Sequence, residues 1–289
     1  MSDRRLDGWP NRHASRFVRA GGLTWHVQVM GEGPVLLLAH GTGAATHSWR
    51  ALAPLLAEHF TVVAPDLPAH GFTNAPAAAR LSLPGMTRSL RSLLVTLDVA
   101  PAMAAGHSAG AAILMRMCLD GQIAPRALVS LNGALLPMGG VAGQMFSPLA
   151  KLLAGLPVLP ALFSWRAGNP RVVENLLQQT GSRIDAEGVG LYARLLRDSG
   201  HTAGALAMMA HWDLAPLVAD LPRLAVPLLL VVGANDRSVP PSQSTVVRDR
   251  VPGATLATLP GFGHLAHEED PVATAALIVG FARETSVLP

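Results

Sequence analysis

Residues Gly106-His107-Ser108-Ala109-Gly110 form a G-x-S-x-G motif, in which one serine stands between two glycines. The motif follows the short apolar run Ala102–Ala105 and opens the apolar segment Ala111–Leu119. A short apolar run is typical of a buried strand, and a longer one is compatible with a buried helix. The pattern therefore predicts a strand, a tight turn and a helix, with Ser108 at the apex of the turn.

Such a turn has a chemical consequence for its serine. The strand and the helix approach each other closely, so a side chain at Gly106 or Gly110 would clash with its neighbours. The turn lifts the Ser108 hydroxyl above the edge of the sheet. It also places the Ala109 N–H at a helix N-terminus, where developing negative charge is stabilised. G-x-S-x-G also occurs by chance as a plain Gly/Ser turn, but the strand–turn–helix context favours a nucleophilic serine.

Strands and helices alternate outward from this motif along most of the chain. Short continuous apolar runs are typical of strands that are buried on both faces of a parallel sheet. We therefore expect an α/β fold, with a mostly parallel twisted sheet and helices on both faces. The predicted strands are Arg16–Ala20, Leu23–Val29, Val35–Ala39, Thr61–Ala64, Ala102–Ala105, Ala127–Leu131, Pro227–Gly233 and Ala254–Leu259. The predicted helices are Trp49–His59, Leu83–Leu97, Ala111–Leu119, Ser242–Arg250 and Pro271–Glu284.

The alternation stops between residues 134 and 211. This segment has no clear strand, but it has prolines, glycines and short amphipathic stretches such as Arg171–Gln179 and Leu191–Arg197. We interpret residues 134–211 as an inserted helical lid. Residues 1–133 and 212–289 then form the two parts of the core domain.

A nucleophilic serine needs a base, and the base needs a carboxylate that orients it. Asp236 follows the buried run Leu228–Val232, so it is expected at the carboxyl end of a strand. His264 lies 28 residues later in the glycine-rich loop Gly261-Phe262-Gly263-His264. The order Ser, Asp, His is the one expected when a triad lies on this type of sheet, which predicts Ser108, Asp236 and His264 as nucleophile, acid and base. The alternatives are an Asx turn or helix cap at Asp236 and a solvated loop histidine at His264.

The oxyanion of an acyl-transfer reaction needs two backbone N–H donors. Ala109 is expected to supply one. The loop His40-Gly41-Thr42-Gly43 ends a predicted strand, and Thr42 is expected to supply the other. The alternative for this loop is a plain strand-to-helix turn.

Other polar residues in similar places favour structural roles. Asp66 lies in a loop after a predicted strand and is expected to fix that loop through backbone N–H groups. His107 is expected to be a packing residue. His70 and His267 have no partners at the spacing of a metal site, so we predict no metal. No G-x-G-x-x-G follows the first buried strand, so we predict no dinucleotide cofactor.

The composition narrows the class of protein. The chain has 289 residues, of which 50% are hydrophobic and 14% charged, and its net charge is +3. The basic residues are scattered, which argues against nucleic-acid binding. One cysteine, Cys118, excludes an internal disulfide. We see no secretory signal and no run of 18 apolar residues, so we predict a cytoplasmic protein, with peripheral membrane contact through the lid left open.

Taken together, the ordered motifs resemble the α/β-hydrolase superfamily over nearly the whole chain. They are His40-Gly41-Thr42-Gly43, Asp66–Gly71, Gly106–Gly110, Gly233–Asp236 and Gly263-His264. Within that superfamily the chain is similar to the magnesium-chelatase accessory proteins of bacteriochlorophyll biosynthesis, through Asp7–Arg12, Trp25–Gln28 and His40–Arg50. The closer resemblance implies a role near magnesium insertion into protoporphyrin in a photosynthetic bacterium and, as partners, the subunits of magnesium chelatase. It does not imply a particular reaction.

The expected lid is rich in methionine, leucine and aromatic residues, which suit a large apolar ligand such as a tetrapyrrole. For most of these residues, packing of the lid on the core is the alternative. The candidate substrate-binding residues are Met138, Met145, Phe163, Trp165, Tyr192, Met209 and Trp212.

Two hypotheses about function follow. The first is a serine hydrolase, esterase-like, that acts on an apolar ester linked to tetrapyrroles. The second is a non-catalytic protein that binds a porphyrin and hands it to the chelatase. A complete triad favours the first, and the pathway association favours the second, because magnesium insertion has no hydrolytic step on the porphyrin itself.

Overall fold

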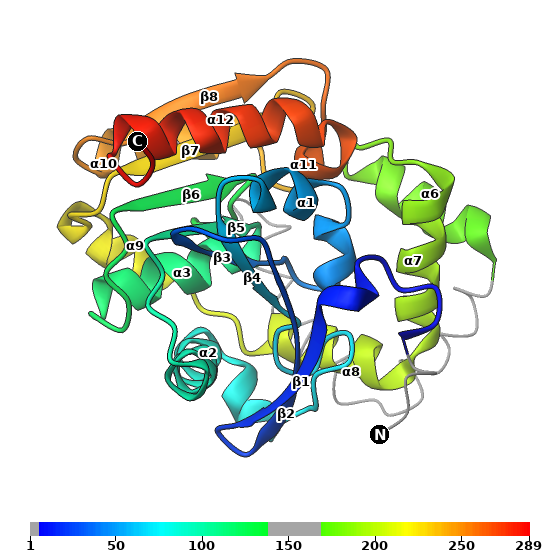
Figure 1. The fold of residues 1–289 in the computed structure, drawn as a ribbon. Helices are drawn as coiled ribbons and strands as arrows, with labels where there is room; N and C mark the ends of the chain where they lie inside the picture. Colours follow the sequence, from blue (N-terminus) through cyan, green and yellow to red (C-terminus); the bar gives the residue numbers. More distant parts are fainter. Residues whose placement is uncertain (1–5, 138–168) are drawn as a thin grey trace.

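The computed structural model describes residues 6–137 and 169–289. Its strands form one eight-stranded sheet in the order β1-β2-β4-β3-β5-β6-β7-β8 (Figure 1). β2 pairs antiparallel with β1 and β4, and all other neighbouring strands are parallel. The mostly parallel sheet of an α/β fold is thereby confirmed. The strands are β1 Ser15–Ala20, β2 Leu23–Met30, β3 Val35–Ala39, β4 Thr61–Pro65, β5 Met103–His107, β6 Ala127–Leu131, β7 Leu228–Gly233 and β8 Thr255–Leu259.

Helices cover both faces of this sheet (Figure 1). They are α1 Leu52–Ala57, α2 Leu83–Leu97, α3 Ala109–Leu119, α6 Pro170–Gln179, α7 Ala186–Arg197, α8 Ser199–Ala210, α9 Ala215–Asp220, α10 Pro241–Arg250, α11 Ala266–Glu269 and α12 Pro271–Glu284. Short 3-10 helices also occur at Arg12–Ala14, Thr46–Trp49, Ala78–Leu81 and Leu221–Arg223.

The central strand β3 shows how the core is divided. Leu36 and Leu38 pack with side chains of α1 and α12, whereas Leu37 and Ala39 pack with side chains of α2 and α3. Successive side chains of a strand point to opposite faces, so a strand between two helical layers has to be apolar at every position. The continuous apolar run of β3 follows from this requirement.

Most predicted elements match to within two residues, but the helix expected at Trp49–His59 is shorter and begins later. A 3-10 helix ends at Trp49, and α1 covers Leu52–Ala57. Pro54 explains the late start, because proline has no N–H for the carbonyl four residues earlier and is tolerated in the first turn of a helix. That carbonyl belongs to Arg50, and it accepts instead a hydrogen bond of 3.1 Å from the Asn11 side chain.

The described part of the segment between β6 and β7 is helical. α6 and α7 contain the two amphipathic stretches expected there, and α8 follows. The side chains of Asn169, Asp185 and Asp198 each accept backbone N–H groups at the start of these helices. Such N-caps satisfy donors that a helix leaves free.

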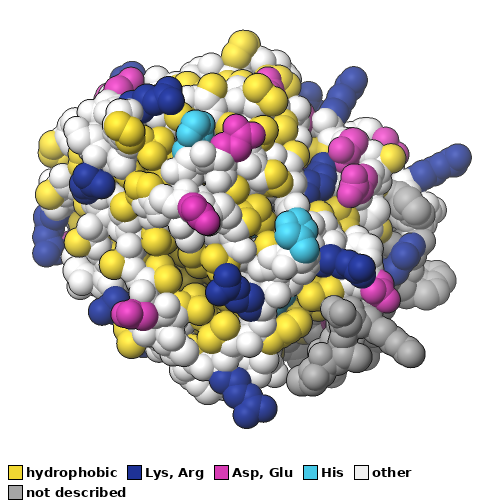
Figure 2. Space-filling view, in the orientation of Figure 1, with side chains coloured by type: hydrophobic (Ala, Val, Ile, Leu, Met, Phe, Trp, Pro, Cys, Tyr) yellow, Lys and Arg dark blue, Asp and Glu magenta, His cyan; other side chains and the backbone are white. Residues whose placement is uncertain are grey.

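The surface agrees with the scattered charges of the sequence. On the face drawn in Figure 2, basic and acidic side chains are interspersed among apolar ones, and neither sign forms a continuous block. Within residues 6–137 and 169–289, none of the helices combines the length and the apolar character needed to span a bilayer.

Candidate active site

The turn between β5 and α3 has the strained backbone of a nucleophile elbow. Ser108 has φ 51° and ψ −119°, a backbone conformation that residues other than glycine rarely adopt. A Cβ added to Gly106 would lie 2.5 Å from the Ala111 nitrogen, and one added to Gly110 would lie 2.1 Å from the Ala39 carbonyl oxygen. Both distances are impossible for real atoms, so these positions require glycine. The predicted strand, turn and helix are confirmed.

Asp236 and His264 lie in hydrogen-bond contact at the carboxyl ends of β7 and β8. His264 Nδ1 is 2.8 Å from Asp236 Oδ2, and the two side chains are 10% and 1% exposed. Asp236 Oδ1 accepts the N–H groups of Ser238 and Val239, each at 2.8 Å. An aspartate oxygen can only accept a hydrogen bond when ionised, so in this pair Nδ1 of His264 is the donor and its Nε2 points away from Asp236. His264 is therefore not a solvated loop residue. Asp236 forms the Asx turn named as its alternative through Oδ1, and contacts the histidine through Oδ2.

The side chain of Asn132 is a partner of Asp236 that the sequence analysis did not identify. Asn132 follows β6, has φ 46°, and donates from Nδ2 to Asp236 Oδ2 at 2.8 Å. The same amide lies 3.3 Å from the Gly263 carbonyl, so it bridges the loops of the candidate acid and base. Its place at a strand's carboxyl end, beside the strand of Asp236, is a signal that could have pointed to it.

His107 connects the base loop to the elbow. His107 Nε2 donates to the His264 carbonyl at 2.9 Å, and the two rings lie 4.7 Å apart between centroids. Burial, followed by the neighbouring His267 and His264, lowers the pKa of His107 well below its usual value. A neutral, buried histidine confirms the packing role expected for it. Among the described residues, Ser108 Oγ has no hydrogen bond with His264 Nε2, a contact that free hydrolases often form only with substrate present.

The loop with Thr42 lies against the elbow. A Cβ on Gly41 would be 3.0 Å from Ser108 Cβ, which shows how closely the two turns approach. Ala44 N–H donates to the Gly41 carbonyl at 3.2 Å, closing a tight turn with Thr42 and Gly43 at its centre. Within the described chain, the N–H groups of Thr42 and Ala109 form no hydrogen bond with protein atoms. Both donors are therefore available to a ligand beside Ser108.

A family model for the alpha/beta hydrolase fold matches residues 34–271 of this chain. The chain belongs to the α/β-hydrolase family. It is 42% identical over 262 residues to the magnesium-chelatase 30 kDa subunit of Rhodobacter capsulatus, and the match covers 90% of this chain and 91% of that protein. The resemblance stated from the motifs, to the superfamily and to magnesium-chelatase accessory proteins, is confirmed.

The chain is also similar to a named hydrolase and to a solved structure. This α/β-hydrolase is 24% identical over 274 residues to 2-hydroxy-6-oxo-6-phenylhexa-2,4-dienoate hydrolase of Burkholderia cepacia, with 89% and 90% of the two chains covered. The solved structure of an alpha/beta hydrolase fold protein from Burkholderia ambifaria matches with a TM-score of 0.78 at 23% identity, over 92% of this chain and 97% of that one. This structural match shows the shared fold.

The candidate substrate-binding residues fall into two groups in the α/β-hydrolase. Met138, Met145, Phe163 and Trp165 lie outside the described residues. Of the others, Met209 is half-buried, and Trp212 packs on the cluster that contains α2 and α3. Tyr192 packs in a different cluster, with its ring 4.4 Å from that of His47. The structure does not bring Tyr192 and Trp212 together.

Tyr192 belongs to an ion-pair network that joins α7 to the core, with Glu268 buried and Asp185 exposed. Its hydroxyl donates to Glu268 Oε1 at 2.7 Å, and Arg50 pairs with Glu268 Oε2 and, at 2.8 Å, with Asp185. Burial raises the pKa of Glu268 to about 7, although Arg50 and the Tyr192 hydrogen bond act in the opposite direction. A tyrosine fixed in this way braces the helix, so the structure favours the packing alternative for Tyr192.

A second Ser-His-Asp chain lies in the N-terminal part of the core. His26 Nδ1 is 2.7 Å from Asp66 Oδ2, and His26 Nε2 is 2.9 Å from Ser15 Oγ. Asp66 also accepts the N–H groups of Thr46 at 2.7 Å and Phe72 at 2.9 Å. The prediction that Asp66 fixes its loop is confirmed, and its additional partner His26 was not expected.

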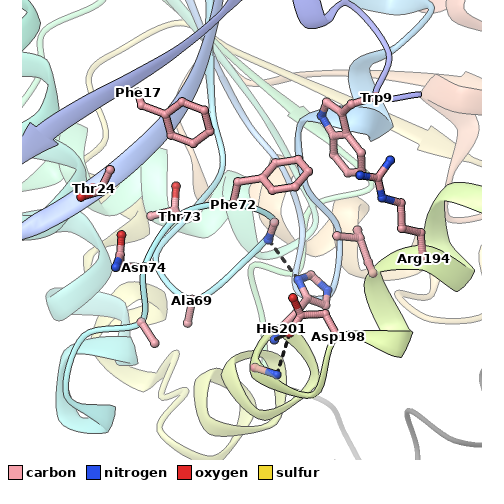
Figure 3. Close-up of a pocket in the computed structure, with 14 residues that line it drawn as sticks. Trp9, Phe17, Thr24, Ala69, Phe72, Thr73, Asn74, Arg194, Asp198 and His201 are labelled. Atoms are coloured by element: carbon pink, nitrogen blue, oxygen red, sulfur yellow. Dashed lines mark hydrogen bonds between the residues drawn. The ribbon is translucent and has the colours of Figure 1, made fainter. Parts of the chain in front are cut away.

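A cavity of about 540 Å³ lies near this second chain and does not include Ser108 in its wall (Figure 3). Trp9, Phe17 and Phe72 give it an aromatic lining, and Arg194 extends over the rings of Trp9 and Phe72. His201 forms part of the wall on the side of the Gly41–Ala44 turn. In the described parts of the chain, no group of three His, Cys, Asp or Glu residues is arranged to hold a metal ion.

Proposed function

We propose that this protein is a serine hydrolase that cleaves an apolar ester, with Ser108 as nucleophile, His264 as base and Asp236 as the orienting acid. The observation that carries the proposal is the hydrogen-bonded His264–Asp236 pair beside a strained serine at a helix N-terminus. Hydrolase relatives and the family membership support the reaction class.

In the proposed reaction, Ser108 Oγ attacks the acyl carbon while His264 Nε2 takes the hydroxyl proton. The carbonyl oxygen becomes an oxyanion, which the N–H groups of Thr42 and Ala109 bind. The protonated His264 then gives its proton to the leaving alcohol, and an acyl-serine remains. Water, activated by the same histidine, attacks the acyl-serine and releases the carboxylic acid.

The substrate class rests on the apolar residues of the segment at 134–211, which we propose is a lid over the site. A link to bacteriochlorophyll biosynthesis near the magnesium-chelatase step rests on similarity to a protein named as a chelatase subunit. A tetrapyrrole ester is apolar and belongs to that pathway, so it is the substrate we propose.

Labelling with a fluorophosphonate probe tests the reaction class. The wild type should be labelled in stoichiometric amount, and Ser108→Ala and His264→Ala should not. Ser15→Ala is the matched control, because Ser15 also contacts a histidine that is paired with an aspartate. Equal labelling of Ser108→Ala and wild type, or no labelling of a folded wild type with either a small or a large probe, would refute the proposal.

A second candidate function is favoured by the same relative. A protein that binds a porphyrin and hands it to magnesium chelatase has no use for a nucleophile, and similarity to a protein named as a chelatase subunit supports this function. Protoporphyrin binding, followed by fluorescence, and chelatase activity with added protein distinguish the two. Under the second function, Ser108→Ala keeps both at the wild-type level; under the first, hydrolysis is lost.

A further inference from the structure

One face of α8 contacts the loops that surround the candidate oxyanion site. His201, Gly204 and Met208 lie at spacings of three and four residues, which places them on the same side of a helix. A Cβ on Gly204 would lie 2.3 Å from the Ala69 carbonyl oxygen, so the helix approaches the loop after β4 as closely as backbone allows. The Thr42 hydroxyl contacts the Met208 sulfur at 3.5 Å.

His201 links two loops of the core at the start of this face. Its Nε2 donates to the Gly43 carbonyl at 3.1 Å, and its Nδ1 accepts the Gly71 N–H at 3.0 Å (Figure 3 shows the second bond). The side chain is buried, and burial is the main reason why the pKa of His201 is lowered to about 4. The ring is therefore neutral at physiological pH, and both of its nitrogens are in use.

The residues before and after Thr42 each have their carbonyl bound by a histidine. His40 Nδ1 donates to the Gly41 carbonyl at 2.8 Å, and this carbonyl shares its planar peptide unit with the Thr42 N–H. His201 holds the Gly43 carbonyl from the opposite side of the turn. Gly43 has φ 77° and no side chain that would limit rotation of the peptide after it. That peptide is held at both ends: its Ala44 N–H donates to the Gly41 carbonyl at 3.2 Å, and its Gly43 carbonyl accepts from His201.

From this geometry we infer that His201 is a positioning residue for the oxyanion site. It fixes the Gly43 end of the turn, so that the Thr42 N–H, the proposed second oxyanion donor, keeps its orientation while charge develops on the substrate. The inference rests on the proposed function. On this inference, helix α8 supports the turn that carries the Thr42 N–H.

Three substitutions separate the two bonds of His201. Gln can donate from a position close to that of Nε2, so His201→Gln keeps the Gly43 bond. Asn can accept at a position close to that of Nδ1, so His201→Asn keeps only the Gly71 bond. His201→Phe keeps the ring volume and loses both. His211→Gln is the matched control, because His211 is exposed at the end of the same helix.

The measurements are kcat and KM for p-nitrophenyl butyrate and the affinity for a trifluoromethyl ketone, whose adduct with serine carries an oxyanion. Loss of a donor in such a site lowers kcat by about 100-fold or more, and displacement of a donor should lower it by at least about 10-fold. We expect this loss in His201→Phe and His201→Asn, with KM nearly unchanged, a parallel loss of ketone affinity, and near wild-type values in His201→Gln. Rates are referred to active sites counted by fluorophosphonate titration, so that partial unfolding does not lower them.

The outcomes are distinct. Equal kcat in His201→Asn and His201→Gln overturns the inference, and the comparison of these two polar variants serves even if His201→Phe does not fold. A folded wild type without hydrolysis or labelling overturns the proposed function and this inference with it. An active wild type with an unaffected His201→Phe overturns the inference alone.

Discussion

The molecule contains two Ser-His-Asp chains, and the one with the better hydrogen bonds is not the one we propose as catalytic. In the chain Ser15–His26–Asp66 both bonds are formed, at 2.9 and 2.7 Å, and the His26 and Asp66 side chains have no exposed surface. In the other chain His264 and Asp236 are bonded at 2.8 Å, and the Ser108 hydroxyl forms no bond with the histidine. Connectivity alone therefore does not identify a nucleophile.

What differs is the backbone around the serine. Ser15 begins strand β1, its N–H donates to the Arg12 carbonyl, and the strand pairs with β2. Ser108 has a positive φ and precedes a helix whose first N–H groups are available to a ligand. A reacting carbonyl needs hydrogen-bond donors for its developing charge as well as a nucleophile. Of the two serines, only Ser108 has such donors beside it. We therefore expect the first chain to stabilise the fold, and we propose the second as the catalytic one.

The largest expected difference between the two chains is in activity. Asp236→Asn should lower kcat by about 10,000-fold, the size seen when an orienting aspartate is lost and the histidine takes the wrong tautomer. Asp66→Asn, assayed under conditions where it is folded, should lower kcat far less, because the hydrogen bonds of Asp66 run to His26 and to the N–H groups of Thr46 and Phe72 and not to the proposed triad. Ester hydrolysis per titrated active site is the measurement. The comparison fails if both variants lose activity equally.

The same two substitutions should have the opposite order of effect on the free energy of unfolding. Burial opposes ionisation of Asp66, but the charge and hydrogen bond of His26 lower the pKa of Asp66 below its usual value, so the carboxylate is charged in the fold. Removing one partner of a buried ion pair typically costs about 3–5 kcal/mol. We expect a loss of that size for Asp66→Asn in urea unfolding, and a smaller loss for Asp236→Asn. Similar losses in both variants would contradict a structural role peculiar to the first chain.

The sequence predicted the fold and most of the candidate site because local pattern is enough for them. The elbow around Ser108, the strand-end positions of Asp236 and His264, and the central strands follow from apolar periodicity and glycine placement. The family motifs then gave the order of the site residues.

The remainder depends on contacts between distant segments, which periodicity does not encode. His26 meets Ser15 and Asp66 only because β2 lies between β1 and β4 in the sheet. Asn132 reaches Asp236 across two neighbouring strands. His201 contacts Gly43 through packing of α8, 158 residues away in the sequence. Only Asn132, at a strand's carboxyl end, has a position that could have pointed to it. His26 lies inside a strand and His201 near a helix start, and neither position indicates a partner in a distant segment.

A third prediction contrasts Asp66 with the other deeply buried carboxylate of these networks, Glu268. Its pKa is raised from 4.5 to about 7, chiefly by burial, so the folded protein holds a proton that the unfolded chain releases. This contribution to stability is present below pH 4.5 and is lost as the pH rises through 7. The loss is about 3 kcal/mol by the relation between pKa and free energy. The pKa of Asp66 is lowered, so its contribution has the opposite sign and is lost only at acidic pH.

Glu268→Gln isolates this effect. The difference in unfolding free energy between wild type and Glu268→Gln, measured in urea at pH values from 4.5 to 8, should shift in favour of the variant by about 3 kcal/mol across that range. The buried histidines with lowered pKa, such as His40 and His70, titrate in both proteins and cancel in the difference. A difference that does not change with pH would show that Glu268 stays ionised beside Arg50.

The smallest effect is expected at Ser15, and it decides whether the first chain acts as a unit. Ser15→Ala removes the bond to His26 Nε2 and leaves that nitrogen buried without its partner, which typically costs about 1–2 kcal/mol. Gln28 Nε2, at 3.4 Å from Ser15 Oγ, loses only a weak contact.

If the serine supports the His26–Asp66 pair, the losses of Ser15→Ala and Asp66→Asn should be non-additive in the double variant, because the bond from serine to histidine matters less once the aspartate is gone. Additive losses would show that His26 is held by Asp66 alone. In either case Ser15→Ala should hydrolyse esters at the wild-type rate, because the hydrogen bonds of Ser15 lie inside the fold and not at a substrate.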